Sequence, residues 1–263
     1  MGRRHLFEIN DQPWCPAVLR DGLTDYLDVL TRFVQYDRAA APILADVMER
    51  SGASAVVDLC SGSGGVAANV FQRAQLEGSK ALSLTLTDLY PNVASLDRVA
   101  SRLGPNCTVW ETPVDATNVP IELKGVRTMF NATHHFQPEV LKKVLADAFE
   151  AKQPLAFFDG ASRSALGVAG MICGPAIEVC AVPFMGSPRL ARAALSWWVP
   201  VLPSMVLWDG VVSSLRAYRP AELQALTHGL EAEDYQWAAG EVGLPWLPMP
   251  ITYLTGITSP HPS

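Results

Sequence analysis

The sequence predicts an α/β fold with a doubly wound, seven-stranded, mostly parallel sheet, an N-terminal helical cap and an apolar insert after strand five. Strand-like and helix-like segments alternate between residues 53 and 164, which requires crossover helices between parallel strands. The alternation stops at the segment 165–214, which is apolar and rich in Gly, Pro and Trp. With 263 residues, 49 % of them hydrophobic, the chain is long enough to bury one full-sized core.

Each expected element has a local reason. Apolar residues at helical spacing between Val18 and Leu30 predict one or two helices within residues 11–41. Short apolar runs predict buried parallel strands. The expected strands are 53–60, 81–88, 107–112, 126–131 and 154–159, and the helices between them are 66–76, 93–103 and 138–152. Pro138 and Pro220 each suit the first turn of a helix, and the segments 235–242 and 251–257 are expected to close the sheet.

Charge and cysteine content exclude several classes of protein. The 20 basic and 26 acidic residues give a net charge of −6, so we expect no nucleic-acid partner. The five cysteines are scattered, with no pair or cluster at zinc-ligand spacing, so we expect reduced thiols and no metal site. No window offers about 18 uninterrupted apolar residues, and we expect no membrane span.

A glycine-containing loop follows the first expected strand. Gly62 and Gly64 allow a tight turn and let a ligand lie against the backbone. Asp58 precedes the loop, and Asp88 ends the next strand, where a carboxylate can bind two ribose hydroxyls. The third glycine of a dinucleotide site is replaced by Ala67, and a carboxylate repels a pyrophosphate. The pattern favours a positively charged nucleoside, with a purely structural turn as the alternative.

These residues resemble the motifs of class I S-adenosylmethionine-dependent methyltransferases, over about residues 53–257. The segment 58–64 is similar to their first motif, although Cys60 stands where the family most often has its first glycine. The segments 87–92, 113–116 and 131–136 are similar to the second, third and fourth motifs. The cofactor-binding residues that the resemblance implies are Asp58, Cys60, Gly62, Gly64, Asp88, Leu89, Asp115, Ala116 and Asn131.

The resemblance implies that Asp88 binds the ribose, that Asp115 binds the adenine amino group, and that Ala116 offers a backbone N–H. His134 and His135 leave the fourth strand at the ligand-binding edge of the sheet. One of them is a candidate general base, because imidazole accepts a proton near neutrality. The alternative is that they cap the next helix or bond to backbone without touching the chemistry.

Aromatic residues outside the motifs are candidates for the acceptor site. Trp14 and Tyr26 of the cap and Trp197 and Trp198 of the insert would bind an apolar acceptor, or else serve only in packing. The insert is interpreted as an apolar lid, with extra core, a homodimer face or peripheral membrane contact as alternatives. Four arginines are candidates for binding an acidic acceptor group or are simply solvated: Arg189, Arg192, Arg216 and Arg219.

We therefore expect an enzyme that moves a methyl group from S-adenosylmethionine to a small, largely apolar or amphipathic molecule in specialised metabolism. The acceptor atom, O, N or C, stays open. The alternatives are an aminopropyl transferase and a non-catalytic cofactor-sensing or membrane-docking protein. The expected location is the cytoplasm, with membrane association as the variant. The expected single domain, 1–263, comprises a helical cap (1–50), a cofactor-binding core (53–164), an apolar lid (165–214) and a closing helix and hairpin (215–257).

Overall fold

The computed structural model describes residues 2–78, 83–186, 189–245 and 247–258. It contains a seven-stranded sheet in the order β3-β2-β1-β4-β5-β7-β6. The strands are β1 (Ala55–Asp58), β2 (Ser83–Leu86), β3 (Cys107–Val109), β4 (Val126–Phe130), β5 (Leu155–Asp159), β6 (Tyr235–Gly243) and β7 (Pro250–Thr258). Strands β1 to β5 pair in parallel, whereas β7 pairs antiparallel with both β5 and β6. The predicted α/β sheet is confirmed; the first two residues of its second strand, 81 and 82, lie outside the described part.

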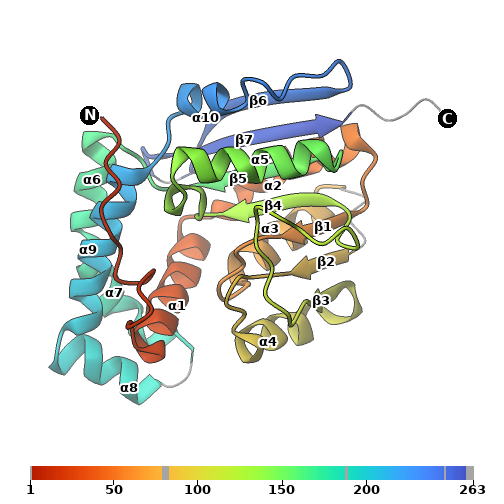
Figure 1. Ribbon diagram of the computed structural model, residues 1–263. Helices are drawn as coiled ribbons and strands as arrows, with labels where there is room; N and C mark the ends of the chain where they lie inside the picture. The colour runs from red at the N-terminus through yellow and green to blue at the C-terminus, as the bar shows by residue number, and fades with distance from the viewer. Residues whose placement is uncertain (1, 79–82, 187–188, 246, 259–263) are drawn as a thin grey trace.

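Helices cover both faces of the sheet (Figure 1). One face carries α2 (Tyr36–Ser51), α3 (Gly65–Leu76) and α4 (Val93–Leu103), and the other carries α5 (Pro138–Glu150) and α10 (Pro220–Leu226). Successive strand residues point to opposite faces, so Val56 packs into the first layer and Val57 into the second. Both sides of β1 are therefore buried, which explains its uninterrupted apolar sequence.

The insert folds as helices. They are α6 (Ala165–Ile172), α7 (Gly174–Ala181), α8 (Arg189–Ala193), the wide turn η4 (Ala194–Trp198) and α9 (Val201–Arg216). With α1 (Ala17–Phe33) they form a third apolar core that includes Tyr26, Met185 and Leu202. Figure 1 shows this helical layer beyond the arrowheads of the parallel strands, at the edge where α/β sheets bind ligands. Within the described residues no single helix could cross a membrane, whereas two bent helix pairs of the insert pass the same length and composition test.

Residues 2–16 form an N-terminal strap that lies along α9 instead of a helix. Arg4 N donates to the carbonyl oxygen of Leu215 at 3.0 Å. The amides of Ile9 and Asn10 donate to the two carboxylate oxygens of Asp209 at 2.7 and 3.0 Å. The expected helix start at residue 11 is therefore wrong: α1 begins at Ala17, after a turn that contains Pro13 and Pro16.

Candidate cofactor and acceptor site

The loop between β1 and α3 has an unusual backbone. Cys60, Gly62 and Gly64 have positive φ values of 59°, 56° and 78°. Gly64 is also packed tightly, since a Cβ there would lie 3.0 Å from Leu86 and 3.1 Å from Leu96. Cys60 adopts a conformation that favours glycine, which is what the related motif most often has there. The loop turns as the glycine pattern predicts.

Asp58, at the end of β1, is hydrogen-bonded to the loop through Ser61. Its carboxylate is buried and accepts hydrogen bonds from the hydroxyls of Ser61 and Thr128, both at 2.7 Å. Burial raises its pKa to about 7, although these two hydrogen bonds favour the ionised form. Asp58 is thus a carboxyl group that titrates near neutral pH, and a neighbouring cation would stabilise its ionised form.

Asp88 lies against the same loop. Its two carboxylate oxygens accept hydrogen bonds from the backbone amides of Gly62 and Tyr90, each at 2.9 Å. Asp115 is exposed on the neighbouring loop, and its Oδ1 accepts from both the amide and the hydroxyl of Thr117. Burial and the carboxylates of Asp88, Asp58 and Asp115 all raise the pKa of the Cys60 thiol. Three acids therefore converge on one loop.

The other expected cofactor residues lie around these acids. Leu89 is exposed directly after Asp88, and Ala116 is buried after Asp115. Asn131 has a positive φ of 52°, a conformation that asparagine tolerates. Its side-chain oxygen accepts from the amide of Gly160 at 2.8 Å, which joins the ends of β4 and β5. No ligand contact tests these residues, so their cofactor roles stay predictions.

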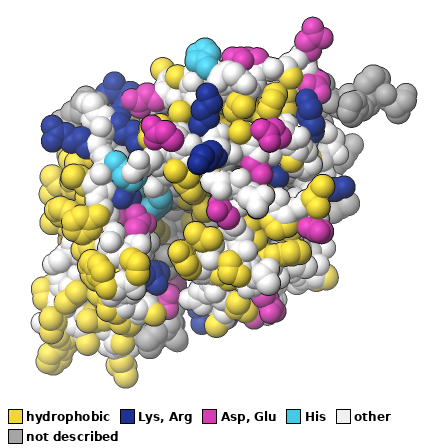
Figure 2. All heavy atoms as spheres, viewed as in Figure 1, with side chains coloured by type: hydrophobic (Ala, Val, Ile, Leu, Met, Phe, Trp, Pro, Cys, Tyr) yellow, Lys and Arg dark blue, Asp and Glu magenta, His cyan; other side chains and the backbone are white. Residues whose placement is uncertain are grey.

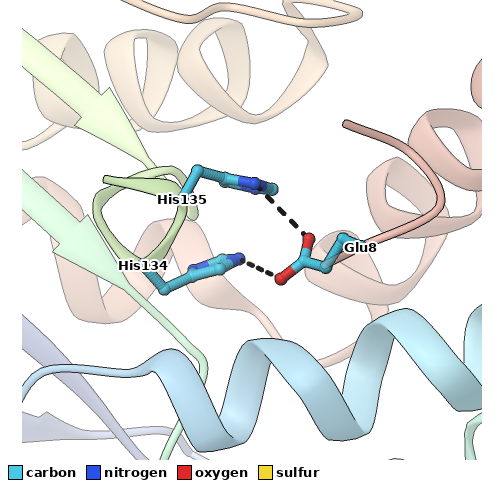
Figure 3. A group of neighbouring side chains, drawn as sticks. All are labelled: Glu8, His134 and His135. Carbon is cyan, nitrogen blue, oxygen red and sulfur yellow. Dashed lines mark ion pairs between the residues drawn. The ribbon is translucent and has the colours of Figure 1, made fainter. Parts of the chain in front are cut away.

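His134 is buried in the turn η2 (Thr133–His135) after β4. Its Nδ1 lies 2.8 Å from Oδ2 of Asp159, which also accepts from the hydroxyl of Thr133 and from the His134 amide. Its Nε2 lies 3.8 Å from Oε1 of Glu8, in the strap. Figure 3 shows both rings turned toward the Glu8 carboxylate. His134 thus lies between two carboxylates.

His135 is half-buried, and its Nδ1 lies 2.8 Å from Asp11 and 3.4 Å from Glu8. Burial alone would lower the pKa of His135, but the carboxylates of Glu8 and Asp11 outweigh it and raise the pKa to about 9. Unless a further cation binds beside these carboxylates, the ring is protonated at neutral pH and has no lone pair to accept a substrate proton. The general-base role stays a prediction, and the geometry favours His134 over His135 for it.

Sequence reasoning missed the partners of the histidines. Glu8 is buried and pairs with Arg216 at 3.1 Å, and Arg216 also binds Asp11 at 2.8 Å. Asp159 could have been predicted as a neighbour of the histidines. It ends an expected strand, and that strand lies beside the one that ends at Asn131. No pattern in the sequence pointed to Glu8, since the partners of its carboxylate are more than a hundred residues away.

The four aromatic candidates are spread over the strap, which contains Trp14, and the helical layer, which contains the other three. Tyr26 is buried between α1 and the insert, where its hydroxyl donates to the Gly174 carbonyl oxygen at 3.4 Å. Trp14, Trp197 and Trp198 are exposed, Trp198 by 83 %. Their contact with an acceptor stays a prediction. Two of the four candidate arginines are buried in ion pairs, Arg192 with Asp25 and Arg216 with the strap carboxylates, which leaves them little capacity for an acidic acceptor.

A cavity of about 260 Å³ adjoins the glycine loop on its α4 side. Its lining residues include Asp28, Ser63, Ser95 and Arg102, but neither Asp88 nor Asp115. Burial raises the pKa of Asp28 to about 6. The cavity therefore lies beside the loop and is separate from the cleft expected to hold the cofactor.

The fold of this chain is similar to those of solved methyltransferase structures. No family model matches this chain, and no curated protein matches it at a significant level. The plantazolicin methyltransferase BpumL in complex with SAH aligns with a TM-score of 0.60 at 12 % identity, over 95 % of this chain and 92 % of that one. The methyltransferase domain of bacterial CtHen1-C aligns with a TM-score of 0.50 at 12 % identity, over 86 % and 99 %.

The pyocyanin biosynthetic protein PhzM gives a TM-score of 0.50 at 15 % identity, over 84 % of this chain and 55 % of that one. At these identities the likeness concerns the fold. Together with the strand order and the antiparallel β7, it shows that this chain has the fold of the class I S-adenosylmethionine-dependent methyltransferases.

Proposed function

We propose that this protein transfers a methyl group from S-adenosylmethionine to a small, largely apolar molecule. The observation that carries the proposal is the convergence of Asp58, Asp88 and Asp115 on the loop around Cys60, at the ligand-binding edge of the sheet. Three carboxylates there disfavour a pyrophosphate and suit a cationic nucleoside. S-Adenosylmethionine carries two positive groups, the sulfonium and the amino group.

The residues present fit this cofactor. A Cβ at Gly62 would meet only the Thr24 methyl, at 3.8 Å, so the backbone of the loop is open to a ligand. The carboxylate of Asp88, half-exposed and bonded only through amides in the described contacts, would hold the ribose hydroxyls. Asp115 and the amide of Ala116 would hold the adenine. When bound, the cofactor supplies a methyl group already activated by its sulfonium.

The small-molecule acceptor is supported by the helical layer and by the comparisons. BpumL is named for plantazolicin and PhzM for pyocyanin biosynthesis, and the fold of this chain resembles both. The insert and the strap cover the ligand edge with apolar helices and buried polar side chains. Positioning of the acceptor is the main task in methyl transfer, because the leaving group needs little help.

Calorimetry with S-adenosylmethionine and its demethylated product tests the cofactor. We expect micromolar binding by the wild type and at least ~10-fold weaker binding by Asp88→Ala, since the loss of two charge-assisted hydrogen bonds exceeds about 1.4 kcal/mol. Asp97→Ala, an exposed carboxylate on α4, is the matched control and should bind normally. Equal affinity in both variants, or tighter binding of NAD, would mean that the cleft has been misassigned.

Turnover with labelled donor then identifies the acceptor. A panel of phenols, amines, carboxylic acids and isoprenoid compounds covers O, N and C acceptors. We expect label in at least one apolar member. Free polyamines incubated with decarboxylated S-adenosylmethionine, the donor of an aminopropyl transferase, should stay unchanged. Tight cofactor binding without transfer to any member would favour the cofactor-sensing alternative.

A further inference from the structure

Glu8, His134 and His135 form a compact set of donor atoms. One carboxylate oxygen and one nitrogen from each ring all lie within 4.8 Å of one another. Glu8 comes from the N-terminal strap, and the histidines come from the turn after β4 (Figure 3). The set is enclosed, because Glu8 and His134 are buried and His135 is largely so.

The donor atoms are already oriented. Asp159, 2.8 Å from Nδ1 of His134, leaves Nε2 as the nitrogen that faces Glu8. Metal-bound histidines almost always donate their other ring N–H to a carboxylate, a backbone carbonyl or a water, and Asp159 is such a partner. Glu8 is held in turn by the hydroxyl of Ser213, which donates to Oε1 at 3.0 Å, and by Arg216.

Nδ1 of His135 lies beside two carboxylates but makes no well-aligned hydrogen bond to either in the described residues. This buried atom is 2.8 Å from Asp11 and 3.4 Å from Glu8. An imidazole nitrogen beside carboxylate oxygens, without a well-aligned hydrogen bond to them, can serve as a ligand to a cation that those carboxylates attract.

The local charge also favours a dication. Glu8, Asp11 and Asp159 carry three negative charges, and Arg216 is the guanidinium paired with the first two. Arg3 faces the same turn but bonds backbone carbonyl oxygens of His134 and Phe136. With both imidazoles neutral, as ligands must be, the carboxylates exceed Arg216 by two charges.

We propose that Glu8, His134 and His135 bind a divalent transition-metal ion of the zinc and iron class. Two imidazoles with carboxylates suit such ions and not Mg²⁺ or Ca²⁺. Bonds of about 2.0 Å in a tetrahedral site place the donor atoms roughly 3.3 Å apart. Oε2 of Glu8 lies 3.4 Å from Nδ1 of His135, and Oε1 lies 3.8 Å from Nε2 of His134, both near that value. The ion would fix the strap to the turn at the end of β4, whether or not the proposed methyl transfer is correct.

The test uses tag-free full-length protein stripped of metal by dialysis against EDTA. Zn²⁺ is titrated by calorimetry, and Co²⁺ by its visible d–d absorption, which reports nitrogen and oxygen ligation. We expect one equivalent of each ion to bind and Mg²⁺ not to compete at millimolar concentration. Glu8→Gln and His135→Ala should each weaken Zn²⁺ binding at least ~10-fold, and Asp159→Asn by a factor of ~10 to 100.

His228→Ala is the matched control, because His228 is an exposed histidine beside Glu231. It should bind Zn²⁺ as the wild type does, and circular dichroism checks that each variant is folded. If Glu8→Gln does not fold, His135→Ala at the cluster's more exposed ring still decides the matter. Absence of Co²⁺ bands in the wild type, or an unchanged affinity in folded His135→Ala, overturns the assignment. Cofactor binding, measured separately, reports on the methyl-transfer proposal alone.

Discussion

Replacing Asp58 by Asn should stabilise the protein at alkaline pH and leave it nearly unchanged in acid. Asp58 has an ordinary pKa of 3.8 when the chain is unfolded, and burial raises this to about 7 in the folded state. The folded state therefore binds the proton more tightly, so this carboxyl group lowers the stability as the pH rises from about 4 through 7. The neutral asparagine does not titrate.

The magnitude follows from the two pKa values. At pH 8 the ionised Asp58 destabilises the fold by about 4 kcal/mol relative to its protonated form, and at pH 4 by less than about 1 kcal/mol. Asparagine can accept only one of the two hydroxyl hydrogen bonds, from Ser61 or Thr128, which costs about 1 kcal/mol at every pH. The variant should thus equal the wild type near pH 4 and exceed it by roughly 3 kcal/mol at pH 8.

Urea unfolding at pH 4, 6 and 8 measures this difference. Asp46→Asn is the control, since Asp46 is an exposed carboxylate on α2 and its replacement should leave the stability at each pH within about 0.5 kcal/mol. The reasoning fails if the difference between Asp58→Asn and wild type does not grow with pH. The same variant should bind S-adenosylmethionine less well, because the carboxylate that lowers stability is the one expected to favour the cation.

Three further predictions concern the backbone, the strap and the surface. Gly64→Ala should lower the free energy of unfolding by about 1–3 kcal/mol, because φ is positive and the new methyl group meets Leu86 and Leu96. Thermal denaturation measures this loss, and an unchanged stability would contradict the packing described. Asp209→Ala leaves two strap amides without acceptors, so limited proteolysis should cut the strap several-fold faster, and equal rates would count against the strap contacts. Trp198→Ser should change the stability by less than about 0.5 kcal/mol because the indole is exposed; a larger loss in urea would show that this side chain is packed.

The regular elements could be predicted because their signals are local. The helix expected at residues 93–103 is observed at Val93–Leu103, where Asn92 caps it by accepting from the Ser95 amide. The helix expected to start at Pro138 does so. The insert was more difficult, since it is apolar on most sides and gives no periodicity that distinguishes inner from outer residues. Trp197 and Trp198 are exposed, and no pattern in the sequence predicts their exposure.

The candidate site also has a part that local sequence patterns predict and a part that they do not. The loop and Asp88 could be placed because parallel strands bring their carboxyl ends to one edge, and Gly62 does bond Asp88. The environment of His134 could not be predicted, because Glu8 is brought to it by the strap, which is held by Asp209 of α9. Interactions between residues so far apart in sequence leave no trace in local propensity.

The route of the strap has a consequence for how the chain folds during synthesis. Glu8 leaves a ribosome before the sheet does, but Ser213, which orients it, is 205 residues further along. The parallel strands β1 to β5 are complete by Asp159, before α9 exists to receive the strap. The histidine cluster is therefore closed only after α9 has been synthesised, and until then the strap lacks the residues that hold it in the folded protein.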